Sequence, residues 1–163
     1  MAVILETKRL VLRQFKTDDL ETIYRYRNDI RCSKYQTWNH KTKSALKLFI
    51  SSQKDKILGK GTIQLAIAKK DDNRIVGDIF LDFDIHTISL GYTIDYLYHR
   101  QGYGYEIISE LLAYLTKTYN YKQVLARVFS NNHPSINLLV KLGFKKVGII
   151  EKEDTIIYSY LLR

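Results

Sequence analysis

The sequence predicts a mixed α/β (α+β) fold, in which a mostly antiparallel central sheet is flanked by helices. Alternating apolar residues indicate consecutive strands between residues 62 and 94. Apolar residues at helical spacing lie before and after that region. The chain has 163 residues, one proline and no repeat or linker. We therefore expect a single domain over residues 1–163.

The first third predicts a strand followed by two helices. Residues 7–15 alternate as a strand does. The first helix carries Leu20 and Ile23 on its apolar face, and the second carries Leu48 and Phe49. A polar segment between the helices contains Trp38.

The middle third predicts an antiparallel meander. A strand from residue 62 is followed by a turn at 70–73, a strand over 75–85 and another over 87–94. The second of these strands has apolar residues on one face. The opposite face carries three aspartates, which are Asp78, Asp82 and Asp84.

The last third predicts alternating helices and strands. A glycine-bearing turn leads into an amphipathic helix, and residues 123–129 form a strand. Pro134 begins a short helix that Asn132 or His133 caps, and Gly143 ends it in a left-handed conformation. Residues 144–150 and 155–162 form a closing strand pair.

Composition limits the classes of function. Cys32 is the only cysteine, so neither an internal disulfide nor a structural zinc site is expected. No apolar run is long enough to cross a membrane, and we expect a cytoplasmic protein. The net charge of +9 favours a polyanionic partner, which leaves nucleic acid, an anionic surface and a phosphorylated small molecule open.

The most informative motif is the turn at residues 99–106, which lies between a strand and a helix. Glycines let the backbone approach a ligand, and the free N–H groups of a helix start attract anions. The spacing is neither that of a Walker loop nor that of a Rossmann fingerprint. A pyrophosphate site and an ordinary turn both fit this motif taken alone.

Six motifs together resemble the GNAT superfamily of acetyl-CoA-dependent N-acetyltransferases, in the branch of the ribosomal-protein N-terminal (alanine/serine) acetyltransferases. Their order along the chain also matches that branch. The motifs are 7–13 (TKRLVLR), 75–79 (IVGDI), 90–92 (LGY), 102–106 (GYGYE), 132–135 (NHPS) and 141–144 (KLGF).

The resemblance implies how acetyl-CoA binds. The fourth strand of this fold, here residues 87–94, separates from the fifth, here 123–129, and the pantetheine arm lies between them. The pyrophosphate lies on the loop that follows, and no metal is required. The cofactor residues implied in this way are Leu90, Tyr92, Thr93, Ile94, His99, Arg100, Gln101, Gly102, Tyr103, Gly104, Tyr105 and Asn132.

The resemblance also implies catalytic residues, with two departures. Leu139 replaces a common tyrosine acid, which makes Ser135 the expected assistant of the departing thiolate. Ser89 replaces a common glutamate base. A protonated amine must lose a proton before it attacks. Among the three strand aspartates we expect Asp78 to accept that proton.

The predicted function is direct transfer of an acetyl group from acetyl-CoA to a primary amine of a protein N-terminus or a small molecule. The alternative is a domain that binds coenzyme A, or docks on RNA or the ribosome, without turnover. An RNA-binding pattern is absent from the sequence, which argues against nucleic acid. The resemblance implies that residues 31–44, with Tyr35 and Trp38, and residues 151–158 shape the acceptor site. A homodimer remains open.

Overall fold

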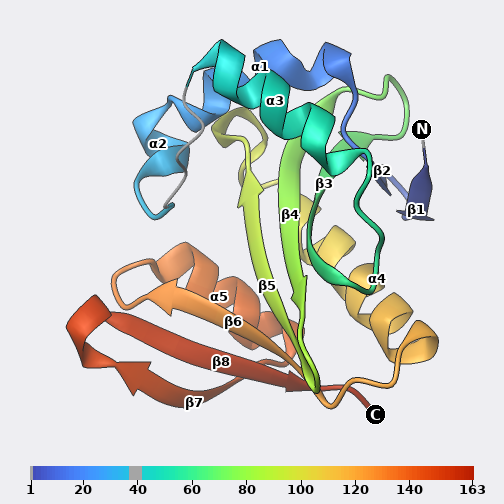
Figure 1. Ribbon diagram of the computed structural model, residues 1–163. Coiled ribbons are helices and arrows are strands. Elements are labelled where there is room, and N and C mark those ends of the chain that lie inside the picture. Colours follow the sequence, from blue (N-terminus) through green and yellow to red (C-terminus); the bar gives the residue numbers. More distant parts are fainter. Residues whose placement is uncertain (1, 37–41) are drawn as a thin grey trace.

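The computed structural model describes residues 2–36 and 42–163 (Figure 1). In that part of the chain, eight strands form one sheet in the order β1-β2-β3-β4-β5-β6-β8-β7. Neighbouring strands are antiparallel except β5 and β6, which are parallel. The strands are β1 (Val3–Glu6), β2 (Leu10–Arg13), β3 (Gly61–Lys69), β4 (Ile75–Phe83), β5 (Thr87–Ile94), β6 (Gln123–Phe129), β7 (Lys145–Ile150) and β8 (Thr155–Leu161).

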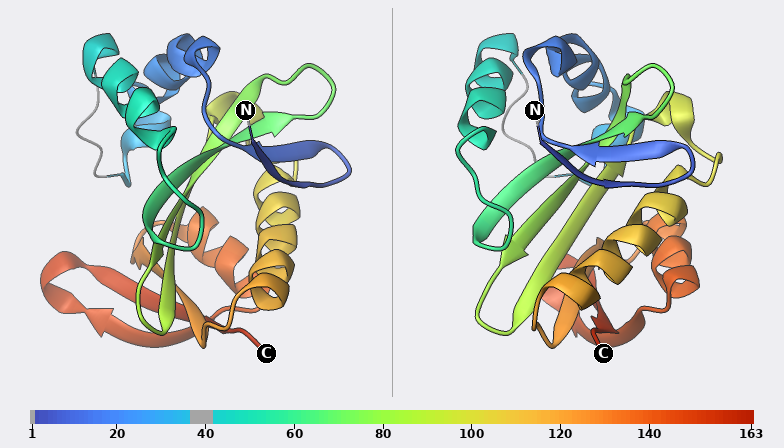
Figure 2. Two further views of the ribbon diagram at one scale, coloured as in Figure 1. Left: turned by 45° about the vertical axis from the view of Figure 1, so that its right-hand side comes forward. Right: turned by 90° about the vertical axis from the view of Figure 1, so that its right-hand side faces the viewer.

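Helices cover both faces of the sheet, as the right-hand view of Figure 2 shows. α1 to α3 lie on one face, and α4 and α5 lie on the other. The mixed, mostly antiparallel fold is therefore as predicted. The helices are α1 (Leu20–Arg27), α2 (Ile30–Ser33), α3 (Lys43–Gln53), α4 (Tyr103–Thr118) and α5 (His133–Leu142), with short 3-10 turns η1 (Thr17–Asp19), η2 (Tyr96–Tyr98) and η3 (Glu151–Glu153).

The N-terminal strand predicted over residues 7–15 is shorter than expected, and a second strand precedes it. β2 covers only residues 10–13, and β1 pairs with it as an antiparallel edge strand. The turn between them is closed by a hydrogen bond from the Thr7 N–H to the Leu10 carbonyl. β1 was missed because its short apolar run has no alternation.

The face of α3 that packs against the sheet matches the predicted one only in part, because Phe49 is buried as predicted and Leu48 is not. Leu48 is 74% exposed, whereas Leu46, Phe49 and Ile50 are buried. Both sets fit helical spacing, and only the packing against α1 and β3 selects between them. α2 was not predicted, because it is a single turn inside a polar segment.

The central meander and the C-terminal elements are close to their predicted positions. β3, β4 and β5 pair in sequence, and Gly77 of β4 comes so close to β5 that a Cβ there would lie 2.2 Å from the Thr93 carbonyl oxygen. Asn132 is the N-cap of α5, and Gly143 ends that helix with a φ of 101°. Within the described residues, no helix has the length and apolar character that a membrane span requires.

The corrected face of α3 is testable with two leucines that are two positions apart. Leu46→Ala empties a fully buried site and should lower the free energy of unfolding by about 2–5 kcal/mol. Leu48→Ala removes an exposed side chain and should change it by less than about 0.5 kcal/mol. Urea unfolding of both variants checks this, and equal losses would contradict the packing described here.

Candidate functional site

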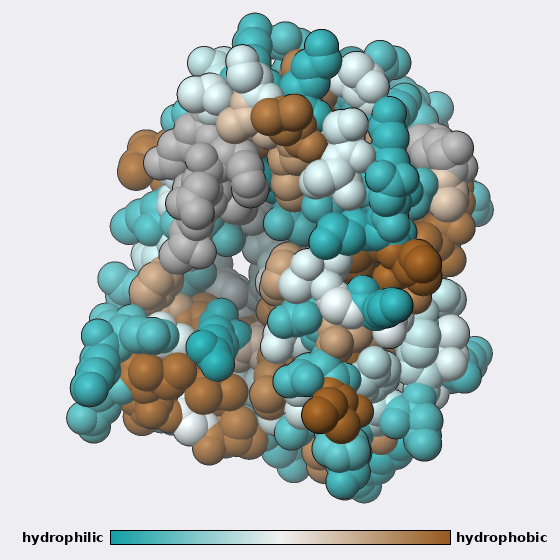
Figure 3. All heavy atoms as spheres, viewed as in Figure 1, coloured by the Kyte–Doolittle hydropathy of each residue, from teal (hydrophilic) through white to brown (hydrophobic). Residues whose placement is uncertain are grey.

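The candidate site is a cleft that opens where β5 and β6 separate. The two strands pair only from Thr87↔Gln123 to Leu90↔Ala126. Beyond that point the cleft has a volume of about 1230 Å³. Figure 3 shows the surface hollowed between the β6–β8 side at lower left and the helices above it. Its walls come from β5, the turn before α4, β6, α5 and the end of α2.

Most of the residues predicted for the site line this one cleft. Gln101 and Asp78 are not among the lining residues, and Gln101 is exposed on the turn. The predicted residues that do line it are Leu90, Tyr92, Thr93, Ile94, His99, Arg100, Gly102, Tyr103, Gly104, Tyr105, Asn132 and Ser135.

Backbone groups of β5 face the open side of the cleft. The Tyr92 carbonyl accepts a hydrogen bond from Nε2 of Gln36 at 3.3 Å, and the Ile94 carbonyl lies 2.7 Å from Nε2 of His99. A carbonyl oxygen only accepts, so the His99 nitrogen is the donor. Alternate residues of a strand present their backbone groups to the same edge. The amide of Gln36 thus shows that the Tyr92 carbonyl can receive an amide N–H from within the cleft.

The turn before α4 presents backbone N–H groups at one end of the cleft. Arg100 and Gly102 have positive φ angles of 60° and 78°, and Gly102 is the N-cap of α4. The first N–H groups of a helix have no partner within it and carry a partial positive charge. Arg100 lines the cleft at this turn, and Lys141 lines it with its ammonium 4.5 Å from the centre of the Tyr105 ring. This end is suited to an anion.

Glu106 holds the turn against the N-terminal strands. Its carboxylate accepts hydrogen bonds from the Thr7 hydroxyl at 2.6 Å, the Arg9 N–H at 2.9 Å and Arg9 Nε at 2.7 Å. The Arg9 guanidinium also lies 4.5 Å from the centre of the Tyr103 ring. The motif at 7–13 and the glycine turn, which lie far apart in the sequence, therefore meet. The sequence predicts each motif but not the contact between them.

Two hydroxyl groups meet at the wall formed by β5 and α5. Oη of Tyr92 lies 2.6 Å from Oγ of Ser135, in the first turn of α5. The Asn132 side chain caps the same turn by accepting from the Ser135 N–H at 3.4 Å. Burial raises the pKa of Tyr92 to about 12, although the hydrogen bond with Ser135 opposes the rise. Leu139, one turn further along α5, lines the cleft without a polar group.

Asp78 lies on the opposite side of β4, beneath α1. Its buried carboxylate accepts a hydrogen bond from the Tyr26 hydroxyl and lies 3.6 Å from Nη2 of Arg27. Burial raises the pKa of the Asp78 carboxyl, against the opposing charge of Arg27. Exposure increases along the predicted acidic face, from the buried Asp78 to the exposed Asp84. Asp78 therefore does not line the cleft, although it was the aspartate expected to accept the amine proton.

Several lining residues were not predicted, and Glu153 in η3 is the most consequential. It is the only carboxylate among the described lining residues. Residues 151–158 were expected to shape the acceptor site, but no spacing rule distinguished this glutamate from its neighbours. Tyr35, in the segment 31–44 that is predicted to shape the acceptor site, lines the cleft, and its hydroxyl donates to the Asn131 carbonyl at 3.3 Å. Trp38 lies outside the described residues.

Buried Cys32 also contributes to the lining, near the end of β5. Its sulfur accepts a hydrogen bond from the Tyr96 N–H at 3.2 Å, and burial raises the pKa of its thiol. A raised pKa keeps the sulfur protonated and weakly nucleophilic. In the described part of the chain, no group of three or more His, Cys, Asp or Glu residues is placed to hold a metal ion.

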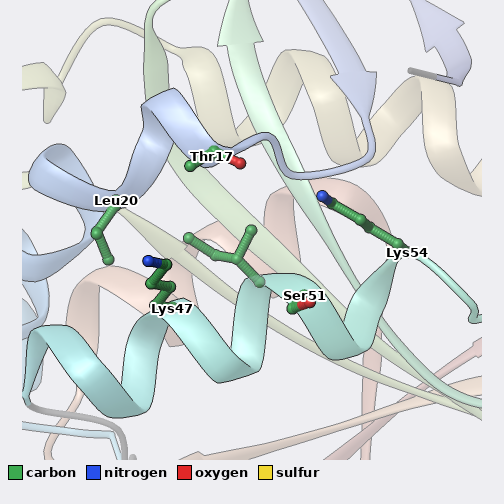
Figure 4. Close-up of a pocket in the computed structure, with 6 residues that line it drawn as sticks. Thr17, Leu20, Lys47, Ser51 and Lys54 are labelled. Carbon is green, nitrogen blue, oxygen red and sulfur yellow. The ribbon is translucent and has the colours of Figure 1, made fainter.

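A second, smaller hollow lies between η1 and α3 (Figure 4). Its volume is about 140 Å³, and none of the predicted site residues lines it. Its polar groups come from exposed lysines and two hydroxyls, so it lacks the convergent buried polar groups of a binding site. The lining residues are Thr17, Leu20, Lys47, Ile50, Ser51 and Lys54.

Comparison with known proteins places this architecture in a family. A family model described as an acetyltransferase (GNAT) domain matches residues 9–145. The uncharacterized N-acetyltransferase YnaD of Bacillus subtilis is 27% identical over 148 residues, which cover 90% of this chain and 85% of that protein.

Solved structures show the same fold. The ribosomal-protein-S5-alanine acetyltransferase from Vibrio fischeri has a TM-score of 0.82 at 21% identity, covering 99% of this chain and 97% of that one. The spermidine N-acetyltransferase from Vibrio cholerae, in complex with CoA and spermine, has a TM-score of 0.80 at 16% identity, covering 94% and 95%. With the family match over most of its length, the chain belongs to the GNAT family and is an N-acetyltransferase that takes its acetyl group from acetyl-CoA.

Proposed function

We propose that the cleft between β5 and β6 transfers the acetyl group of acetyl-CoA directly to the primary amine of a protein N-terminus or a small molecule. The observation that supports this proposal is the separation of the two parallel strands. It creates a channel with backbone groups along one wall and a helix N-terminus at one end. An extended amide chain that ends in phosphates is complementary to both features.

The residues present fit acetyl-CoA. The turn at 100–105 and the start of α4 suit a pyrophosphate, with Arg100 and Lys141 close by. The Tyr92 carbonyl, which already accepts the Gln36 amide, suits an amide of the pantetheine arm. Asn132 lines the opposite wall. The His99 ring is held by the Ile94 carbonyl, so we assign it to shaping the turn as well as to the phosphate end.

The chain must also assist the chemical step, for which acetyl-CoA supplies an activated thioester. Backbone N–H groups on the cleft edge of β5, at Leu90 or Tyr92, can polarise a carbonyl group. The Ser135 hydroxyl, in the first turn of α5, can donate to a departing sulfur, and the positive end of the helix favours negative charge there.

Glu153 is our candidate for the proton acceptor, in place of Asp78. An alkyl amine has a pKa of about 10 and must lose a proton before it attacks. Glu153 lines the cleft, whereas the Asp78 carboxylate is buried beneath α1 against Tyr26 and Arg27. A water molecule between Glu153 and the amine would complete the path.

The acceptor end of the cleft argues against a polyamine. A polyamine carries several positive charges at neutral pH, so carboxylates favour its binding and neighbouring arginines oppose it. Among the described lining residues, Glu153 is the only carboxylate, whereas Arg31 and Arg127 add positive charge and Tyr35 and Phe129 add aromatic rings. This combination favours an acceptor with one reacting amine, such as a peptide N-terminus or an amino-acid-like molecule.

The direct test is an acceptor panel with acetyl-CoA, which contains short peptides with free N-termini, amino acids and spermidine. Thiol release and mass spectrometry of the acceptor report transfer. We expect the peptides or amino acids to be acetylated more rapidly than spermidine. Tight acetyl-CoA binding without transfer to any amine would instead support a binding module.

Gly102 provides a test of the pyrophosphate end. Gly102→Val places a β-branched residue at a positive φ, which strains the turn and displaces its N–H groups. We expect acetyl-CoA to bind about tenfold more weakly in isothermal titration. Gly61→Val is the matched control, because Gly61 also has a positive φ of 59° but lies at the start of β3. Equal affinity of the Gly102 variant and the wild type would remove the turn from the cofactor site.

Glu153 is tested by Glu153→Gln, with Glu151→Gln in the same 3-10 turn as the control. The first variant loses a proton acceptor and should lower kcat/KM by about 10²-fold. It should also change the acid limb of the pH profile of kcat/KM, while Glu151→Gln keeps both. If Asp78→Asn alone altered that limb, the proton would leave through the buried Asp78 site instead.

A further inference from the structure

The Tyr92–Ser135 hydroxyl pair is a short polar contact between two elements of the cleft wall that the assigned cofactor contacts leave unexplained. Only the backbone of Tyr92 was assigned to the cofactor, and Ser135 was assigned to the departing sulfur. The structure adds the 2.6 Å contact between Tyr92 Oη and Ser135 Oγ. The two residues come from different elements, β5 and α5, so the contact spans the wall.

The direction of this hydrogen bond decides what Ser135 can do. Each hydroxyl has a single hydrogen. If Ser135 donated to Tyr92, its hydrogen would be used and could not reach a ligand. If Tyr92 donates, the Ser135 hydrogen remains free to point elsewhere.

Chemistry favours Tyr92 as the donor. A phenol is a stronger acid than an aliphatic alcohol and therefore the better hydrogen-bond donor. The other acceptor near Tyr92 Oη is the Ser135 carbonyl at 3.4 Å, a long contact to an oxygen that the helix already uses. The raised pKa of Tyr92 keeps its phenol protonated across the pH range in which an acetyltransferase works.

We propose that Tyr92 is a positioning residue, whose side-chain hydroxyl holds Ser135 with its hydrogen directed into the cleft toward the departing sulfur. This inference rests on the proposed function. In the step it serves, the amine lone pair forms the new N–C bond, and the C–S bond breaks with its electron pair on sulfur. The sulfur accepts the Ser135 hydrogen bond. The ammonium nitrogen loses two protons in all: Glu153 accepts the first before the attack and passes it to solvent, and it accepts the second as the C–S bond breaks. Neither hydroxyl is consumed.

The same contact could be only a brace between β5 and α5, and the two roles predict different results. A brace depends on the Tyr92 ring and on the stability of the wall. A positioning role depends on the hydroxyl and exists only while Ser135 has its own hydroxyl. Tyr92→Phe keeps the ring and removes the oxygen, so it separates the two roles.

The kinetic experiment is a double-mutant cycle of Tyr92→Phe and Ser135→Ala, measured with an acceptor that the wild type acetylates. We expect Ser135→Ala to lower kcat by about 10²-fold. Tyr92→Phe should lower it on the order of tenfold, with KM for acetyl-CoA unchanged. In the Ser135→Ala background, Tyr92→Phe should have no further effect on kcat. Tyr160→Phe, in β8 against Phe144, is the control for loss of a remote tyrosine hydroxyl.

A binding experiment tests the proposal without turnover. If the pair stabilises a thiolate, CoA should bind more tightly as pH rises toward the pKa of its thiol. Acetyl-CoA, which has no free thiol, should lack this increase and serves as the matched ligand. The difference between the two ligands should shrink in both Tyr92→Phe and Ser135→Ala.

Two results would overturn the positioning role. One is an equal loss of kcat from Tyr92→Phe in the wild-type and Ser135→Ala backgrounds, which indicates a brace. The other is an unchanged pH difference between CoA and acetyl-CoA in Tyr92→Phe. Failure of the proposed function would give a different result, which is a wild-type protein that acetylates no amine. The binding experiment can still be interpreted in that case, because it needs no turnover.

Discussion

The short pairing between β5 and β6 is the constraint on which the rest of the site depends. Four residue pairs hold the strands together at one end, and beyond Leu90 and Ala126 they diverge. Backbone polar groups that lose a strand partner must find another or remain hydrated. The Tyr92 and Ile94 carbonyls meet this requirement through the side chains of Gln36 and His99. An extended ligand with amide groups can replace these side chains as the hydrogen-bond partner of the strand edge.

The two sides of the opening are held by separate contacts. On the α4 side, Glu106 ties the glycine turn to Thr7 and Arg9. On the α1 side, Arg25 forms an ion pair with the buried Asp95, which also caps η2. These anchors connect the N-terminal region to both ends of the β5–α4 turn. The cleft is thus supported by residues that do not line it, which is how a rigid site is usually maintained.

The two ends of the cleft are lined by different groups. Basic side chains and the N-terminus of α4 line the end at the glycine turn, where we propose that the phosphates bind. The other end holds Glu153 in the turn between β7 and β8, opposite the end of α2. The hydroxyls of Tyr92 and Ser135 belong to the wall formed by β5 and α5. Part of the net charge of +9 therefore lies around the proposed phosphate site.

The sequence alone was sufficient for features that depend on neighbouring residues. Alternation identified β3 to β5, helical spacing identified α4, and Asn132, Pro134 and Gly143 marked the ends of α5. These signals are local, so they can be read without knowledge of the fold. Tertiary structure decided which side of α3 is buried, that Asp78 lies beneath α1, and that Glu153 and Tyr92 Oη lie at the cleft. Those outcomes depend on strand pairing and on contacts between residues far apart in the chain, where one residue of register or one helix face changes what a side chain meets.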